Sequence, residues 1–181
     1  MEKKFKVVAI AGSLRQQSLH QMLVRAAQEL APDNMEIEVL DISQIPLYNS
    51  DVESAGWPPA VAEFRDKIEA AHGVIFAVPE YNGSVPGVLK NAFDWASRRG
   101  LVAEKPGVTM GGSPGALGAT KAQEHMRQVM MHTNMYVMPR PTIAIPKMGD
   151  KFVDGKLVDE PTRGFLAEQL QKFANWIGHF N

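Results

Sequence analysis

Hydroxyl, cationic and amide side chains gather in one loop near the N-terminus. The segment Gly12-Ser13-Leu14-Arg15-Gln16-Gln17-Ser18-Leu19-His20 follows the apolar run Val7–Ala11 and leads into a helical pattern. Backbone N–H groups at a helix N-terminus are unpaired and favour an anion. Ser13 and Ser18 can donate hydroxyl hydrogen bonds, and Arg15 adds positive charge. The loop therefore suits a phosphate, although Ser18 as a plain N-cap and Arg15 as a solvated side chain explain it equally well.

This first loop lacks the signatures of two common nucleotide sites. The P-loop needs a glycine followed by Lys-Ser or Lys-Thr, and the dinucleotide fingerprint Gly-x-Gly-x-x-Gly needs a second glycine where Leu14 stands. The sequence therefore disfavours a nucleoside triphosphate site and a Gly-x-Gly-x-x-Gly dinucleotide site.

A second loop, Pro79-Glu80-Tyr81-Asn82-Gly83-Ser84-Val85-Pro86-Gly87, has the composition of a binding site for a flat ring. Tyr81 offers a flat apolar face with a polar tip, and Asn82 carries both donors and acceptors for the edge of a heteroaromatic ring. Gly83 lets the backbone approach a ligand closely. The alternative is a plain turn before a helix, with Ser84 as the cap and Pro86 at the first helical position.

A third loop, residues 111–118, contains four glycines and one proline. Backbone without side chains suits a planar ligand lying against it, with Ser113 near the polar ring atoms. A flexible connection is the alternative.

Apolar runs and helical patterns alternate along the chain and would position these loops. We expect strands at 7–11, 35–40, 73–78 and 108–110, and a fifth made of 135–138 continued by 143–145. We expect helices near 19–30, 58–71, 87–98, 119–132 and 162–177, and a loop at 41–59. This alternation predicts one α/β domain over 1–181, an open parallel sheet with helices on both faces. Ligands bind beyond the carboxyl ends of such strands, where all three loops lie.

Composition excludes several classes of protein. The 181 residues contain no cysteine, which rules out disulfides, and their net charge of −1 gives no electrostatic reason to expect nucleic acid or an anionic membrane as partner. The longest apolar runs are of strand length, too short to span a membrane. The N-terminal segment Met1–Lys6 enters a strand directly, without a cleavage site, so the expected location is cytoplasmic.

The first loop and the segment Pro79–Trp95 together resemble the NADPH-dependent FMN reductase family, which includes quinone and chromate reductases. The resemblance covers nearly the whole chain in length and element order. It implies a flavodoxin-like, doubly wound, five-stranded parallel sheet in the order 2-1-3-4-5. It also implies FMN as cofactor and NADPH or NADH as co-substrate.

The family's loops imply which residues contact FMN. Its first loop wraps the phosphate, which here implies Ser13, Arg15, Ser18, His20 and Gln21, although many relatives have Asn where this chain has His20. Its second loop holds the isoalloxazine ring, which implies Pro79, Glu80, Tyr81, Asn82 and Ser84. Its third loop implies Ser113 and Gly115.

The resemblance implies ping-pong transfer of electrons from NAD(P)H through FMN to a small-molecule acceptor such as a quinone, chromate, an azo compound or free flavin. No catalytic side chain and no metal are expected, because the cofactor carries the chemistry. A non-catalytic electron carrier of the flavodoxin type is an alternative, but such carriers are strongly acidic and this chain is nearly neutral with Arg15 in its phosphate loop. A flavin-free protein on the same fold is a third possibility.

Relatives form dimers through the helix that begins at Gly87, so the resemblance implies a homodimer and leaves a homotetramer open. Gln123 and Arg127 match positions used in further assembly, whereas Glu124 departs from the aromatic residue of some relatives. Arg98 and Arg99 are candidates for the phosphates of NADPH, and a solvated helix end explains them equally well. The methionines near 126–138 are expected in the core, with a subunit interface as the alternative.

Overall fold

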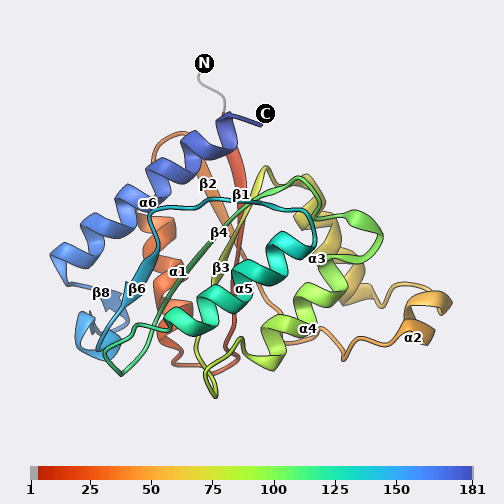
Figure 1. The fold of residues 1–181 in the computed structure, drawn as a ribbon, viewed down its shortest axis with the longest axis horizontal. Helices are drawn as coiled ribbons and strands as arrows, with labels where there is room; N and C mark the ends of the chain where they lie inside the picture. Colours follow the sequence, from red (N-terminus) through yellow and green to blue (C-terminus); the bar gives the residue numbers. More distant parts are fainter. Residues whose placement is uncertain (1–3, 181) are drawn as a thin grey trace.

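A parallel β-sheet forms the middle layer of the molecule (Figure 1). The computed structural model describes residues 4–180. The main strands are β1 (Phe5–Ala11), β2 (Met35–Leu40), β3 (Gly73–Ala77), β4 (Pro106–Gly112) and β5 (Tyr136–Val137). They lie in the order β2-β1-β3-β4-β5, and each neighbouring pair is parallel. The predicted strand order is therefore confirmed.

Helices cover both faces of this sheet (Figure 1). The side chains of α1 (Leu19–Glu29) and α6 (Glu160–Gly178) pack into one apolar cluster on one face. Those of α3 (Pro59–Ala70), α4 (Gly87–Ala96) and α5 (Thr120–His132) pack into a second cluster on the other face. All residues of β3 and β4 are buried, as expected for strands covered on both sides.

The ends of β1, β3 and β4 meet at one edge of the sheet. Ala77 pairs with Ala11 on one side and with Met110 on the other. The pairing continues past the strands, since the Gly12 N–H donates to the Ala77 carbonyl at 2.9 Å and the Val78 N–H donates to the Met110 carbonyl at 2.8 Å. The three loops singled out in the sequence therefore start side by side.

The expected fifth strand is divided in two. β5 pairs with the start of β4, and β6 (Ile143–Ile145) pairs with its end. Pro139 and Pro141 stand between them, and a proline has no N–H for the ladder. The buried amide of Gln169 on α6 bridges the gap by donating to the carbonyls of Thr109 at 3.2 Å and Pro141 at 2.8 Å.

The segment expected as a loop over 41–59 contains a short helix, α2 (Ser50–Ala55). None of its residues is buried, so it has no apolar periodicity that the sequence could reveal, although its Asn49 N-cap was a usable signal. The segment is held against α4 because Trp95 and Asn91 both donate to the Pro46 carbonyl at 2.8 Å.

Smaller differences concern helix ends and short elements. The predicted helix 87–98 ends at Ala96 and is followed by a short helix, η1 (Arg98–Gly100), whereas the final helix is longer than predicted at both ends. A second short helix, η2 (Met148–Lys151), and a hairpin of β7 (Phe152–Val153) and β8 (Lys156–Leu157) precede α6. The core placement predicted for the methionines is confirmed for Met126, Met130, Met135 and Met138, but Met131 is exposed.

The N-terminal segment Met1–Lys6 was expected to lack a cleavage site. Its residues 1–3 lie outside the described part of the chain. Among residues 4–180, no helix combines the length and the apolar character needed to cross a bilayer.

Candidate functional site

A cleft of about 140 Å³ opens where the three loops converge, at the carboxyl edge of the sheet. It brings together eight of the predicted site residues: Ser13, Arg15, Ser18, His20, Pro79, Glu80, Tyr81 and Ser113. The other four, Gln21, Asn82, Ser84 and Gly115, are not part of its lining. The expected convergence of the loops is therefore present, and these four residues lie next to the cleft or outside it.

Ser18 caps α1 at the base of the cleft. Its hydroxyl oxygen accepts hydrogen bonds from the backbone N–H groups of His20 at 3.2 Å and Gln21 at 3.4 Å. Both bonds use the oxygen as acceptor, so the hydroxyl hydrogen remains for a bond into the cleft. Ser18 is thus an N-cap, as the alternative interpretation of the first loop held, and it still has a donor for an anion.

Ser13 links the first loop to the second. The Tyr81 hydroxyl donates to the Ser13 hydroxyl oxygen at 3.3 Å, and the Gln21 side chain donates to the Ser13 carbonyl at 3.3 Å. Ser13 is buried, whereas Arg15 is exposed and makes no hydrogen bond or ion pair through its side chain within residues 4–180. Gln21 therefore braces the loop, and the guanidinium of Arg15 is free for a ligand.

His20 lies buried beneath the cleft and contacts the ends of two strands. Its Nε2 accepts a hydrogen bond from the Gly112 N–H at 3.4 Å. Burial lowers the pKa of His20 from 6.5 to about 4, a shift opposed in part by hydrogen bonding to the Val78 backbone and reinforced by the positive charge of Arg15. The imidazole is therefore neutral at pH 7 and ties the first loop to the third.

The second loop is a tight hairpin. Tyr81 and Ser84 exchange backbone hydrogen bonds of 3.1 Å in each direction, and the two residues between them, Asn82 and Gly83, have φ values of 52° and 71°. Asn-Gly is the strongest sequence signal for such a turn, and it was present in the sequence. The interpretation of Ser84 as the helix cap is wrong, because Pro86 occupies that position before α4.

Two side chains of this hairpin loop reach the first turns of α5. A carboxylate oxygen of Glu80 accepts from the Ala122 N–H at 3.2 Å, and the Ser84 hydroxyl lies 3.0 Å from Nδ1 of His125. A carboxylate near a helix N-terminus is also favoured by the helix dipole. These contacts hold the second loop in place.

Most glycines of the third loop are required by the protein's own packing. A Cβ on Gly111 would lie 2.6 Å from the Val78 carbonyl oxygen, and one on Gly112 would lie 2.6 Å from the Met148 sulfur. Gly118 has a φ of 61°, and its Cβ would lie 2.6 Å from the carbonyl carbon of Ala144. Gly115 is the exception, since the nearest atom to its Cβ would be the Ser113 hydroxyl at 3.8 Å.

Residues 5–150 match the model of the NADPH-dependent FMN reductase family. The chain belongs to this family.

Named relatives match over nearly their whole length. The chain is 42% identical to an NAD(P)H-dependent FMN reductase of Pseudomonas aeruginosa over 180 residues, which cover 98% of this chain and 97% of that protein. It is 38% identical to a quinone reductase of Escherichia coli over 184 residues, with coverage of 98% and 97%. Among solved structures, the flavoenzyme NAD(P)H:acceptor oxidoreductase of Paracoccus denitrificans superposes with a TM-score of 0.90 at 35% identity, covering 97% of this chain and 98% of that one.

The cleft fits the phosphate end of FMN, the cofactor that the family name implies. Its base offers the free hydroxyl hydrogen of Ser18, the buried hydroxyl of Ser13 and the N-terminus of α1, with the guanidinium of Arg15 at the rim. FMN is larger than the cleft. The rest of the cofactor would therefore lie against the outer surface of the second and third loops, where Tyr81 is 46% exposed.

One residue of the cleft lies outside the three loops and could not be predicted from their sequences. Met148, in η2, lines the cleft because its N–H donates to the Ser113 carbonyl at 2.9 Å. The segment after β6 is thereby folded back onto the third loop. A contact between residues so far apart in sequence follows only from the sheet, so loop composition could not reveal it.

Four residues with expected roles in assembly or co-substrate binding form contacts within the chain. Arg98 stacks on Tyr48 and Arg99 on Trp57, with guanidinium carbons 5.0 Å and 4.9 Å from the ring centres, so both help to hold the 41–58 segment. Gln123 is buried and donates to the Ile143 carbonyl at 2.9 Å, so its predicted place on an assembly surface is wrong. Arg127 donates to the Met138 carbonyl at 3.1 Å.

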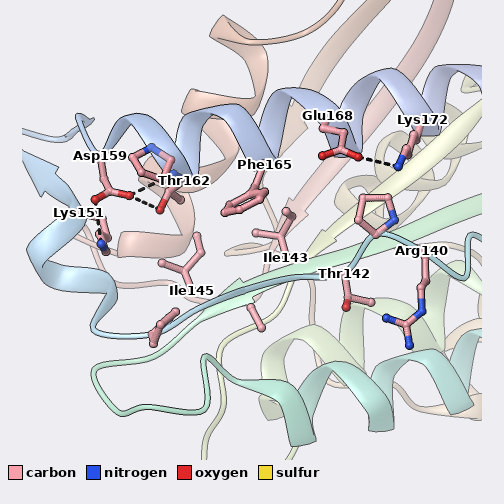
Figure 2. Close-up of a pocket in the computed structure, with 14 residues that line it drawn as sticks. Arg140, Thr142, Ile143, Ile145, Lys151, Asp159, Thr162, Phe165, Glu168 and Lys172 are labelled. Carbon is pink, nitrogen blue, oxygen red and sulfur yellow. Dashed lines mark hydrogen bonds and ion pairs between the residues drawn. The ribbon is translucent and has the colours of Figure 1, made fainter.

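A larger cavity lies elsewhere in the described chain. It measures about 680 Å³ and lies between β6 and α6 (Figure 2). None of the predicted site residues lines it.

Proposed function

We propose that the chain is an FMN-dependent NAD(P)H oxidoreductase that passes electrons to quinones and similar small acceptors. The observation that carries the proposal is the cleft itself, in which hydroxyls, a free guanidinium and a helix N-terminus meet at the sheet edge. The names of the FMN reductase and quinone reductases among its relatives support the same activity.

Within this proposal, Ser13, Arg15 and Ser18 bind the phosphate, while His20 and Gln21 hold those residues in position. Pro79, Glu80, Tyr81, Asn82 and Ser84 of the second loop, with Ser113 and Gly115 of the third, form the surface for the ring. Glu80 and Ser84 act mainly through α5, because their polar atoms already contact it.

Bound FMN would supply the hydride chemistry, accepting from NAD(P)H and delivering to the acceptor. The residues lining the cleft bind and orient. Among them, Glu80, His20 and Tyr81 are the candidates for acid–base work, and each already has a partner or a fixed charge state. Glu80 contacts the α5 backbone, the Tyr81 hydroxyl donates to Ser13, and the lowered pKa keeps His20 neutral. Because Tyr81 is exposed, the surface proposed for the ring is open to solvent. This openness favours a ping-pong cycle, in which NAD(P)H and the acceptor occupy the same space one after the other.

The cellular context is also part of the proposal. We infer a cytoplasmic protein, where NAD(P)H is supplied, acting without nucleic acid or membrane partners. We infer a homodimer, with a tetramer as the further possibility. A groove of about 400 Å³ between α4 and α5 supports the pairing, because one of its walls is α4, the helix on which the family resemblance places the dimer contact.

Purification followed by spectroscopy and steady-state kinetics tests the activity. A yellow protein that oxidises NADPH or NADH rapidly only when a quinone is added agrees with the proposal, and parallel double-reciprocal lines agree with the ping-pong cycle. A yellow protein inert toward both nucleotides would instead identify an electron carrier. A colourless protein that does not take up added FMN would identify a flavin-free protein.

A further inference from the structure

The cavity between β6 and α6 has the size and lining of a ligand site. We call it the edge pocket; its walls are residues 140–146 on one side and the first half of α6 on the other, with Lys151 and Asp159 at one end. Its volume of about 680 Å³ is within the range of small-molecule sites, which are mostly apolar with a few polar groups. The proposed activity does not use it.

The middle of the edge pocket is apolar. Figure 2 shows Phe165 of α6 near Ile143 of β6 at its middle, and Ile143 is buried whereas Phe165 is exposed. Phe165 is 61% exposed, so most of its ring is in contact with water. An apolar or aromatic ligand would remove this surface from water.

The ends of the edge pocket carry charge, and the charges do not cancel. Lys151 pairs with Asp159 at 2.8 Å, and Lys172 pairs with Glu168 at 2.6 Å, so both carboxylates are neutralised. Arg140, at the opposite end from Lys151 in Figure 2, is exposed and has no ion pair or hydrogen bond within the described chain. The unneutralised charge is therefore positive and would attract an anion.

The backbone of β6 argues against a peptide as the occupant. β6 is the end of the sheet, but it has only three residues and stands between Pro141 and Pro146. Prolines and short length are the features that block the addition of another strand to a sheet edge. The edge pocket therefore suits a small molecule better than an extended chain.

The edge pocket is connected to the cleft by two short hydrogen bonds. The Ser113 N–H donates to the Ile145 carbonyl at 3.0 Å, and the Met148 N–H donates to the Ser113 carbonyl at 2.9 Å. Ile145 and Pro146 line the edge pocket, while Ser113 and Met148 line the cleft. A ligand that shifts or stiffens residues 145–146 therefore acts on the third loop.

We propose that the edge pocket binds a small aromatic anion, with its ring against Phe165 and its charge toward Arg140, and that its occupancy changes the affinity of the cleft for FMN. Thermodynamic linkage requires the reverse effect to have the same size. The binding part does not rest on the proposed function, because it concerns a different surface.

Fluorescence titration with anilinonaphthalene sulfonate tests the site on FMN-loaded protein, with uncharged phenylnaphthylamine as the matched probe. Phe165→Ser should weaken sulfonate binding about tenfold. Arg140→Gln should weaken it about three- to fivefold and leave the uncharged probe unaffected. Leu47→Ser and Arg25→Gln, at exposed positions outside the edge pocket, are the controls and should leave both probes unchanged.

Sulfonate binding that neither pocket variant weakens, or that the controls weaken as much, would overturn the site. Failure of the wild-type protein to bind the sulfonate would also overturn the site. A smaller assembly for Phe165→Ser in sedimentation would then show that a second copy of the chain covers this face. The linkage is measured by calorimetry. The FMN dissociation constant is determined with and without saturating sulfonate, and the sulfonate dissociation constant is determined with and without saturating FMN. We expect the two dissociation constants to change by the same factor, about twofold or more. Dissociation constants that do not change would overturn the linkage.

Discussion

Ser18 combines a structural and a binding function in one hydroxyl group. Its oxygen accepts from the backbone of α1, and its hydrogen remains available to a ligand. Two substitutions separate these functions. Ser18→Ala removes the cap and should lower the free energy of unfolding by about 1 kcal/mol. Ser18→Asp keeps the cap, because Asp is an equally good N-cap residue, but places a negative charge beside the phosphate.

We therefore expect Ser18→Asp to retain wild-type stability while weakening FMN binding by at least about tenfold. Urea denaturation and flavin fluorescence titration measure the two quantities. FMN affinity that is unchanged in Ser18→Asp would show that the phosphate does not bind at this end of α1.

His20 should make stability depend on pH. In the unfolded chain its pKa returns to about 6.5, so between pH 6.5 and 4 the unfolded state takes up a proton that the folded state does not. The unfolded state is thereby favoured as the pH falls through this window. The loss amounts to about 3 kcal/mol in the free energy of unfolding.

The matched variant is His20→Asn, which has no titrating group at this position. Its free energy of unfolding should lack this loss, so the wild-type value should fall relative to the variant as the pH drops from 7 to 4, as measured by urea denaturation at each pH. Curves that stay parallel would mean that His20 is not kept neutral by burial.

Residue types and the family resemblance together predicted eight residues that meet in the cleft, because the loops carrying them follow buried strands of a parallel sheet. They could not show which polar atoms the protein itself would use. His20, Glu80 and Ser84 were predicted as ligand contacts, yet each contacts another element first, through Gly112, Ala122 and His125 respectively. Such pairings depend on distances between elements, which the sequence of a loop does not contain.

At the scale of elements, most positions of the third loop that hold glycine have no room for a side chain, because neighbouring strands and segments pack against them. Gly118 has a positive φ and no room for a Cβ beside the backbone of Ala144, whereas Gly115 faces open space. Gly118→Ala should therefore lower the free energy of unfolding by about 2 kcal/mol or more. Gly115→Ala should change it by less than about 0.5 kcal/mol. Thermal and urea denaturation measure the free energy of unfolding of both variants. An equal loss in the two variants would contradict this account.

The strands were predictable where the whole segment is buried and apolar, as in β3, because a short continuous apolar run between turn residues is typical of a strand covered on both faces. Of β4 only the core, residues 108–110, was predicted, because proline and glycine residues flank it. Prediction failed where polar or proline residues decide the structure. α2 has no buried residue, and the break between β5 and β6 depends on Pro139, Pro141 and the amide of Gln169. Asn82-Gly83 indicates a hairpin turn, but the same two residues also suit a ligand loop, so their sequence alone does not separate the two roles.

At the scale of the whole molecule, a parallel sheet gathers one loop from each of three strands at a single edge. This arrangement explains why residues from Ser13 to Met148 meet in one cleft although the segments between them differ in length and type. It also places the edge pocket one strand away from the cleft, on the last strand of the sheet. Both sites therefore depend on the strand order more than on any single loop.

The central claim is that electrons pass from NAD(P)H to an acceptor through FMN held in this cleft. The most direct measurement is the visible spectrum of the FMN-loaded protein under anaerobic conditions, with NADPH or NADH added first and a quinone second. The account predicts that either or both nucleotides bleach the flavin band and that an equivalent of quinone restores it. A flavin band that neither nucleotide bleaches, or that quinone does not restore, would contradict the account.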